Sequence, residues 1–262
     1  MKNINKSHII LLLAIGLMIV FSSCVSKDVP TPAPAGNGIL LFRLHTNVDT
    51  SEVKVPGQVY TMTGGRRITV SKAQLYISGI QLVQTNELLL PGPAINVLKL
   101  QQQNEYTIGS VAAGNYVSLN FNVGLSAATN GTMPSSSDSI LYRKDMWFDS
   151  TAFVNGGGFV FVDFEGTIDT AVTPSPGNAL IPFAYRIGTN TFLERINMPN
   201  KNFTVLANQP VEVNMIIDYS KLFNGIQLNN GSLSVTTSAE NNSWSWAAQI
   251  ANNIPGMFRY EQ

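Results

Sequence analysis

The sequence predicts an all-β protein, an antiparallel two-sheet β-sandwich that ends in a short C-terminal helix. Residues 114–124 place apolar side chains at every second position and polar ones between them, which is the pattern of a half-buried antiparallel strand. Residues 74–83 are apolar on both faces, which indicates a central, covered strand. Short apolar runs separated by Gly, Pro and Asn recur along the rest of the chain, as is typical of sandwiches and barrels.

The same patterns predict the other strands. We expect them at residues 39–45, 55–62, 95–100, 106–108, 159–166 and 211–217. Residues 182–187 and 191–197 are expected to form a hairpin around Gly188-Thr189-Asn190. A long loop, with one short helical turn towards its end, is expected between the strands at 114–124 and 159–166.

The C-terminal part is expected to hold one more strand and the helix. Asn229-Asn230-Gly231 is a tight-turn signal that precedes a strand at residues 232–237. Ser243 is predicted to cap a helix that runs to about Asn253, because apolar residues recur there at helical spacing.

Residues 1–23 are predicted to be a lipoprotein signal peptide. Lys2 and Lys6 precede an apolar run, and Ser22-Ser23-Cys24 follows it, so a basic start and an apolar core lead to small residues at a cleavage point. The apolar run, residues 9–21, is shorter than the roughly 20 residues that a transmembrane helix needs. We therefore expect lipidation of Cys24 rather than an uncleaved anchor. Cys24 is the only cysteine, so the chain cannot form an internal disulfide.

Residues 24–37 are predicted to be a lipid-anchored tether, and residues 38–262 a single domain. Pro30, Pro32 and Pro34 favour an extended, semi-rigid spacer. Lys27-Asp28 is similar to the surface-export signals of Bacteroidetes lipoproteins. The expected location is the outer membrane, with the domain facing the periplasm or the cell surface.

Charge argues against nucleic acid as a partner. Two of the 16 Lys and Arg residues fall in the signal, so 14 basic residues meet 16 acidic ones in the mature chain, a balance of −2. Charged residues make up 12% of the chain and show no basic cluster that could neutralise phosphates. The sequence also lacks a Gly-rich phosphate loop and a Ser/His/Asp or Cys/His set, so we expect no enzymatic activity.

Several stretches together resemble the MbnP-like family, which is named for a copper-binding periplasmic protein associated with methanobactin. The matching stretches are residues 76–82, 113–125, 146–147 with 158–166, 183–188 and 248–258. They follow one another in order over nearly the whole mature chain.

The resemblance implies a β-sandwich and an exported, non-enzymatic copper-binding role, often beside a dihaem cytochrome c peroxidase-like partner. It also implies copper ligation by histidines and by a tryptophan that is oxidised to kynurenine. Family members often have histidine in a Tyr-His-Ile-Gly motif, and this chain has Arg186 there. The mature chain has one histidine, His45.

His45, Met146 and Trp147 are the candidate metal ligands. Copper favours imidazole, and Met146 and Trp147, if the tryptophan is oxidised, could lie near His45. A metal site normally needs three or four converging ligands, and the alternative is that His45 simply ends a strand. Asp163 and Glu165 are a second candidate, because they share one strand face at a rise of about 6.6 Å. They could hold a hard cation or perform glycosidase chemistry, or pair with basic groups on the next strand.

The leading interpretation is therefore an exported, lipid-anchored binding protein that handles copper. The alternative is a cell-surface adhesion or glycan-binding module, which would use Trp147, Trp244 or Trp246 as a stacking surface. The two differ in what they require: the first needs His45 to meet Met or Trp side chains, and the second needs an exposed tryptophan in a shallow groove.

Overall fold

The computed structural model describes residues 36–155, 157–237 and 244–261. These residues belong to one compact unit, Pro34–Gln262. The predicted signal, Cys24, nearly all of the tether and the capping Ser243 lie outside the described residues. In the described part no helix is long and apolar enough to cross a membrane.

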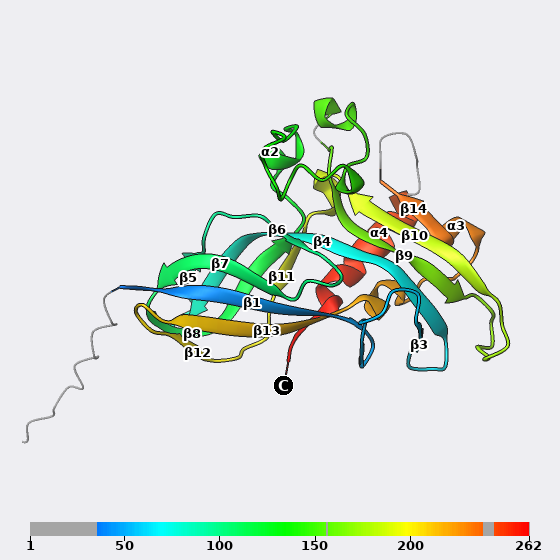
Figure 1. Cartoon of the computed structure of the whole chain (residues 1–262), viewed down its shortest axis with the longest axis horizontal. Helices are drawn as coiled ribbons and strands as arrows, with labels where there is room; N and C mark the ends of the chain where they lie inside the picture. The colour runs from blue at the N-terminus through cyan, green and yellow to red at the C-terminus, as the bar shows by residue number, and fades with distance from the viewer. Residues whose placement is uncertain (1–35, 156, 238–243, 262) are drawn as a thin grey trace, which may run out of the picture. The chain divides into compact units, whose positions relative to one another are not determined.

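The described strands form two sheets, here called sheet A and sheet B (Figure 1). Sheet A contains β1 (Asn37–Val48), β2 (Ser51–Glu52), β7 (Glu105–Ala112), β13 (Pro210–Asp218) and β15 (Phe258–Tyr260). Sheet B contains β3 (Val59–Thr61), β4 (Arg67–Gln84), β5 (Leu89–Pro91), β6 (Val97–Lys99), β8 (Gly114–Val123), β9 (Val160–Asp169), β10 (Leu180–Gly188), β11 (Glu194–Asn197), β12 (Phe203–Val205) and β14 (Ser234–Thr236).

The prediction of a mainly β chain is confirmed, but the prediction of purely antiparallel sheets is wrong. In sheet A, β1 pairs with β13 in parallel, from Ile39 opposite Pro210 to Asn47 opposite Asp218. In sheet B, β10 pairs with β14 in parallel, and both sheets are therefore mixed. Hydrophobic alternation reports which face of a strand is buried and not its direction, so the sequence pattern could not distinguish these pairings.

One apolar core is shared by the two sheets, which gives the fold a sandwich-like arrangement. Leu40, Phe42 and Leu44 of β1 are buried on the inner face of sheet A. The ring of Phe42 lies 6.5 Å from the ring of Phe121 in β8 of sheet B. At about 25 cal/mol per Å² of apolar area removed from water, this core is the main source of folding free energy.

The strand at 114–124, β8, contains an irregularity that the alternation did not predict. The register shifts where Val83 and Gln84 of β4 pair with Ser118 and Tyr116 of β8. Tyr116 consequently joins the core with Leu119, while Val117 is only partly buried. An extra residue in one strand moves the following side chains to the other face.

Strand β4 is central, as predicted, and the long connection between β8 and β9 passes beside its middle. Its residues 68–75 pair with β9 and residues 77–84 pair with β8. The chain between β8 and β9 therefore departs and returns beside Tyr76, where the amide of Gly124 donates to the Tyr76 carbonyl over 2.9 Å. Gly124 has φ +116°, and a Cβ there would lie 2.5 Å from the Phe161 ring, so this exit requires glycine.

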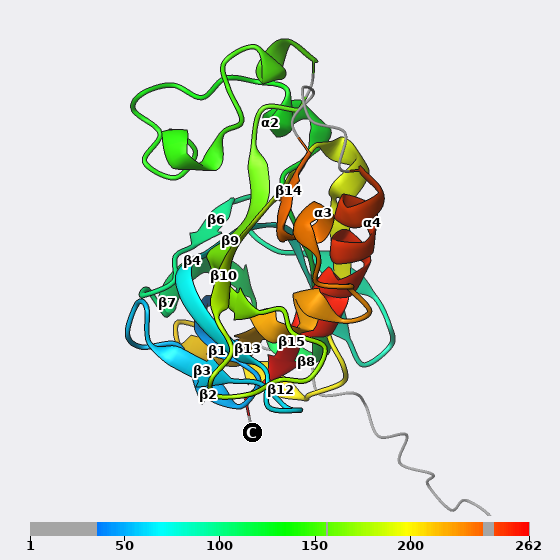
Figure 2. The ribbon, with the colours of Figure 1, turned by 90° about the vertical axis from the view of Figure 1, so that its right-hand side faces the viewer.

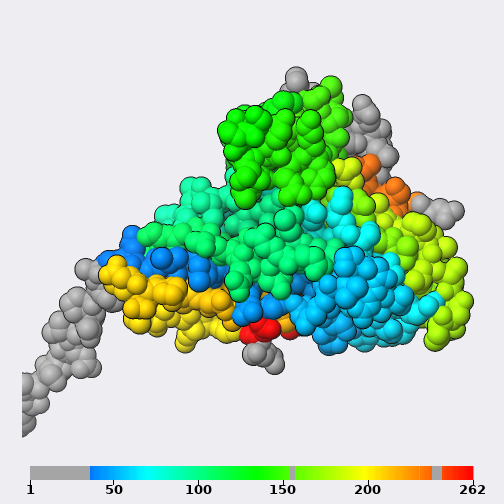
Figure 3. All heavy atoms as spheres, in the orientation of Figure 1, coloured from blue at the N-terminus to red at the C-terminus, as the bar shows by residue number. Residues whose placement is uncertain are grey.

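Residues 125–159, here called the excursion, cover the outer face of sheet B. They contain a small aromatic cluster with Trp147, Phe153 and Phe159, which is separate from the main core. Figure 3 shows the excursion in green, standing out from the strands that it covers. Its helical elements are α2 (Ala127–Asn130), η1 (Lys144–Met146) and η2 (Ala152–Asn155).

The C-terminal helix is confirmed, and the predictions just before it are partly wrong. The remaining helical elements are η3 (Asn190–Phe192), η4 (Tyr219–Phe223), α3 (Asn230–Leu233), α4 (Trp244–Asn253) and η5 (Ile254–Met257). Helix α4 buries Ala247, Ile250 and Ala251, and it packs beside β14 and α3 (Figure 2). The tight turn predicted at residues 229–231 is instead the start of α3, where Asn229 is the N-cap of a capping box.

The predicted hairpin around Gly188-Thr189-Asn190 is wrong as well. Strand β10 pairs with β9 and β14, whereas β11 pairs with β8. The turn residues belong instead to the connection through η3, where Thr189 has φ +70°. A Gly-Thr-Asn sequence signals a change of direction, but it does not specify which strand receives the next one.

Candidate functional site

His45 lies near the end of β1, on the face opposite the core, and its side chain is 15% exposed. The turn after β1 returns the chain as β2, with Asn47 opposite Glu52. This brings the Glu52 carboxylate to 2.8 Å from Nδ1 of His45. We call His45, Glu52, Asn104 and Glu261 the His45 corner.

The hydrogen bonds at this corner indicate which ring nitrogen of His45 is the donor. The hydrogen bond from His45 lowers the pKa of Glu52, against the opposing effect of desolvation, so Glu52 is ionised at neutral pH and can only accept. Nδ1 of His45 must therefore be the donor. Asn104 also donates to Glu52, over 3.2 Å. In the neutral imidazole, Nε2 is left with a free lone pair.

Nε2 of His45 faces a second carboxylate. Glu261, which follows β15, places Oε2 at 3.7 Å from Nε2. Two atoms that are each about 2.0–2.2 Å from one metal ion lie at most about 4.4 Å apart, so this spacing is compatible with two ligands of one ion. Among the described residues no group of three or more His, Cys, Asp or Glu side chains is arranged to hold a metal. A metal here would thus have two protein ligands and complete its coordination with water.

A buried lysine lies close to the same corner. Lys99 of β6 is fully buried, and its Nζ donates to the carbonyls of Leu100 and Gln103 over 2.5 and 2.7 Å. Burial lowers the pKa of Lys99 to about 7, and the charge of Glu52 opposes this shift. Lys99 thereby holds the turn that presents Asn104 to His45.

Met146 and Trp147 are not brought together with His45. Both lie in the aromatic cluster of the excursion, where Met146 is fully buried and Trp147 is 8% exposed. The Trp147 ring meets those of Tyr142 and Phe153 edge-on, each at 5.3 Å. Its Nε1 donates to the carbonyl of Leu141 over 3.1 Å.

Arg186 holds the segment that carries these two residues. Its Nη2 donates to the carbonyl of Trp147 over 2.8 Å and to that of Asp145 over 3.3 Å. The guanidinium, at the position where the family motif has histidine, is therefore a hydrogen-bond donor and not a metal ligand. It ties the excursion to β10.

Asp163 and Glu165 share one face of β9, and Lys72 of β4 lies between them. Its Nζ is 3.1 Å from Asp163 and 3.6 Å from Glu165, and Nε of Arg186 is 4.0 Å from Asp163. Desolvation and the neighbouring Glu165 raise the pKa of the buried Asp163 to about 7, and Lys72 opposes this. Against its own desolvation, Lys72 has a raised pKa because of Asp163. We call these four residues the charged row.

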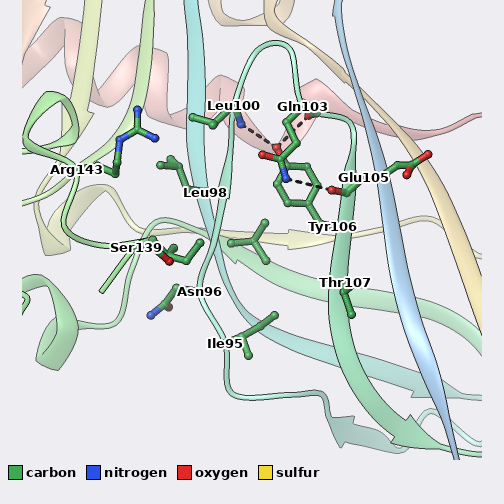
Figure 4. A pocket seen from close by; sticks show the side chains of 12 residues that line it. Ile95, Asn96, Leu98, Leu100, Gln103, Glu105, Tyr106, Thr107, Ser139 and Arg143 are labelled. Carbon is green, nitrogen blue, oxygen red and sulfur yellow. Dashed lines mark hydrogen bonds between the residues drawn. The ribbon is translucent and has the colours of Figure 1, made fainter. Parts of the chain in front are cut away.

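A groove of about 590 Å³ lies between β6, β7 and the middle of the excursion, residues 139–143 (Figure 4). Its floor is aliphatic, with Leu98 and Leu100, and the half-buried Tyr106 closes one side. The Tyr106 hydroxyl accepts from the Leu100 amide and donates to the Gln103 carbonyl. The groove can therefore take a small, mainly apolar group, but the described residues bring no cluster of reactive groups into it.

Sequence reasoning missed Glu52, Asn104, Glu261 and Lys99. Glu52 could have been found, because Asp49-Thr50-Ser51 directly after the strand is a turn signal that folds the chain back onto it. Asn104 is 59 residues from His45 in the sequence, and Glu261 reaches it only through the pairing of β15 with β13. These contacts depend on sheet order, which local patterns do not contain.

A solved structure and a family model match this chain. A solved structure, MbnP from Methylosinus trichosporium, matches with 16% sequence identity and a TM-score of 0.46 over 72% of this chain and 78% of that chain. A search of curated proteins found no match. The family model described as MbnP matches residues 37–241, which is more than half of the chain, and the chain therefore belongs to the MbnP family.

Proposed function

We propose that this chain is an exported, lipid-anchored, non-enzymatic binding protein of the MbnP family that takes one copper ion at the His45 corner. One observation carries the choice of site: Glu52 fixes Nδ1 of His45 as a donor, which leaves Nε2 facing Glu261 at 3.7 Å. A carboxylate that orients the second nitrogen of a histidine is the usual support of a metal ligand.

The donor set favours Cu(II) over Cu(I). An imidazole nitrogen and a carboxylate oxygen suit Cu(II), whereas Cu(I) favours thiolate and thioether sulfur. The thioether of Met146 is buried among aromatic rings, so the combined set His45, Met146 and Trp147 does not fit a single ion. In this proposal copper is bound and carried, and His45 and Glu261 hold it.

Titration of the purified mature protein with Cu(II) tests the site. The expected result is one bound equivalent, with affinity reduced at least tenfold in His45→Gln and reduced less in Glu261→Gln. Met146→Leu is the matched control and should bind as the wild type does. Unchanged binding in His45→Gln would reject the site.

Anchoring is tested separately, at Cys24. Mass spectrometry of the mature N-terminus should find a lipidated Cys24, and Cys24→Ser should move the protein from the membrane fraction to the soluble fraction. An unmodified N-terminus upstream of Cys24 in membrane-bound protein would contradict the proposal.

The family resemblance extends the proposal to a partner, a dihaem cytochrome c peroxidase-like protein. Native membranes solubilised in mild detergent should yield a haem-staining protein that co-purifies with this chain. If co-purification is lost when copper is removed, the association with the partner depends on bound copper.

The alternative, glycan binding, is favoured by one feature. A hollow of about 420 Å³ is lined by Met133, Tyr142, Trp147 and Phe148, and aromatic faces are suited to stacking on sugar rings. Trp147 is mostly buried there, and Trp244, which is 41% exposed, packs on Phe192. Oligosaccharides that quench tryptophan fluorescence in the wild type but not in Tyr142→Ala would favour this alternative.

A further inference from the structure

The end of the domain where the chain enters the described structure is built from four segments. They are residues 36–39, 84–89, 112–115 and 204–210, here called the entry end. The amide of Ala113 donates to the Gly36 carbonyl over 2.9 Å, and that of Asn208 to the Asn37 carbonyl over 2.8 Å. Tyr116 pairs with Gln84 on one side and with Phe203 on the other, which brings the remaining segments to the same end (Figure 1).

Large apolar side chains are exposed at the entry end. Leu206 is 55% exposed, Leu88 50%, Ile39 46% and Leu89 44%. Leu88 and Leu89 follow the tip of the β4–β5 turn, and Leu206 lies in the turn between β12 and β13. Three turns or strand ends therefore each present apolar groups to the outside.

Charge distinguishes this end from the opposite one. Glu87 is the only charged residue in the four segments of the entry end. The opposite end, around β3, the β3–β4 turn and the β9–β10 loop, also exposes apolar residues, among them Val55 at 55%, Val59 at 48% and Val172 at 99%, but it carries Lys54, Arg66 and Arg67 as well. Exposed apolar residues among charged ones are ordinary, whereas four of them on a nearly uncharged end favour contact with an apolar surface.

We propose that the entry end rests on the lipid surface to which the protein is anchored, with Leu88, Leu89 and Leu206 in contact with the bilayer. This inference depends on the proposed lipidation of Cys24. Only eleven residues lie between Cys24 and Gly36, so the twelve Cα–Cα steps span at most about 43 Å when fully extended. The anchor keeps the entry end close to the bilayer, so contacts that would be weak in free solution become intramolecular.

The nearly uncharged composition also indicates the kind of lipid contact. Basic segments bind anionic lipids and release them as salt increases. The entry end has no Lys or Arg in its four segments, so its contact should form on zwitterionic lipid and should be insensitive to salt.

The test uses the mature lipoprotein reconstituted into phosphatidylcholine vesicles. Because Cys24 is the only cysteine and lipidation consumes its thiol, Leu206→Cys and Leu89→Cys each create a single site for a fluorophore. Val172→Cys is the matched control, an exposed apolar position at the opposite end. We expect lipids that carry a quencher at the headgroup to quench the labels at 206 and 89 several-fold more than the label at 172, at both low and high salt.

The outcomes separate this inference from the anchoring on which it depends. Protein that fails to float with the vesicles would overturn both. Vesicle-bound protein with equal quenching at all three positions would overturn only the inference. Shielding of the label at 206 that grows with protein concentration, without lipid quenching, would assign the entry end to a second copy of the chain and would also overturn it.

Discussion

The His45 corner and the aromatic cluster around Trp147 differ in almost every physical property. His45 is surrounded by Glu52, Asn104 and Glu261, and every contact that the structure gives its ring nitrogens is to a carboxylate or an amide. Trp147 is surrounded by aromatic rings and makes a single side-chain hydrogen bond, to a backbone carbonyl. The corner can exchange a ligand with solvent, while the cluster excludes water.

This difference explains why the three residues cannot serve one ion. His45 belongs to sheet A, and Met146 and Trp147 close the outer face of sheet B. The cluster stabilises the excursion and has the buried character of a core, whereas the corner has the polar character of a binding site. The predictions below test that division of roles, from the largest expected effect to the smallest.

Removal of the Trp147 ring should cause the largest loss of stability. Trp147→Ala deletes the centre of the cluster, and aromatic-to-alanine changes in cores typically cost about 3–5 kcal/mol. Denaturant unfolding of Trp147→Ala and His45→Ala side by side should show a loss of about 1 kcal/mol or less for His45→Ala. A greater loss of stability in His45→Ala than in Trp147→Ala would contradict the structural role given to the Trp147 cluster.

Lys99, on the side of the His45 corner, should make stability rise with pH. Burial lowers its pKa to about 7 in the folded chain, so between pH 7 and about 10.4 the unfolded chain binds the proton that the folded chain lacks. The free energy of unfolding should therefore increase over this range, relative to Lys99→Met, by up to roughly 5 kcal/mol. Parallel pH profiles of wild type and Lys99→Met would contradict this.

Asp163, beneath the excursion, should have the opposite pH dependence. Its pKa is raised to about 7 by desolvation and by Glu165, so between pH 4 and 7 the folded chain holds a proton that the unfolded chain has lost. The stability of the wild type relative to Asp163→Asn should thus fall as pH rises from 4 to 7. Melting temperatures of both proteins across this range provide the measurement, and a difference that grows with pH would contradict it.

Substitution of Arg186 should change the stability less than the substitutions of Trp147, Lys99 and Asp163. Arg186→Lys keeps the positive charge near Asp163 but lacks the planar, rigid guanidinium whose Nη2 donates to both excursion carbonyls. We expect a loss of about 1 kcal/mol, together with faster proteolysis of the excursion. Lys72→Arg, which preserves charge in the same charged row, is the control and should leave the excursion protected.

Much of the fold was accessible from the sequence because periodicity reports burial directly. The central position of β4 followed from apolar residues on both of its faces, and α4 from apolar residues at helical spacing. The parallel pairing of β1 with β13 was not accessible, because 161 residues separate Val48 from Pro210 and no local pattern reports the direction in which two distant strands meet. The prediction of a hairpin around Gly188 was wrong for the same reason, because local sequence does not report which strand pairs with the next one.

The candidate site was accessible only in part. His45 was identified because it is the one histidine outside the predicted signal peptide, but its partners Asn104 and Glu261 reach it through sheet pairing. Met146 and Trp147 are adjacent in the sequence and apolar, and this pattern suits a packed cluster as well as a soft metal site. Only the surroundings of Met146 and Trp147 in the structure distinguish a packed cluster from a metal site.

The central claim, that the metal ligands are at the His45 corner and not in the Trp147 cluster, is tested most directly by electron paramagnetic resonance of Cu(II) bound to the mature protein. We expect a spectrum with nitrogen coupling from one imidazole, which disappears in His45→Gln and persists in Met146→Leu. A spectrum that survives in His45→Gln and is lost in Met146→Leu would contradict the account.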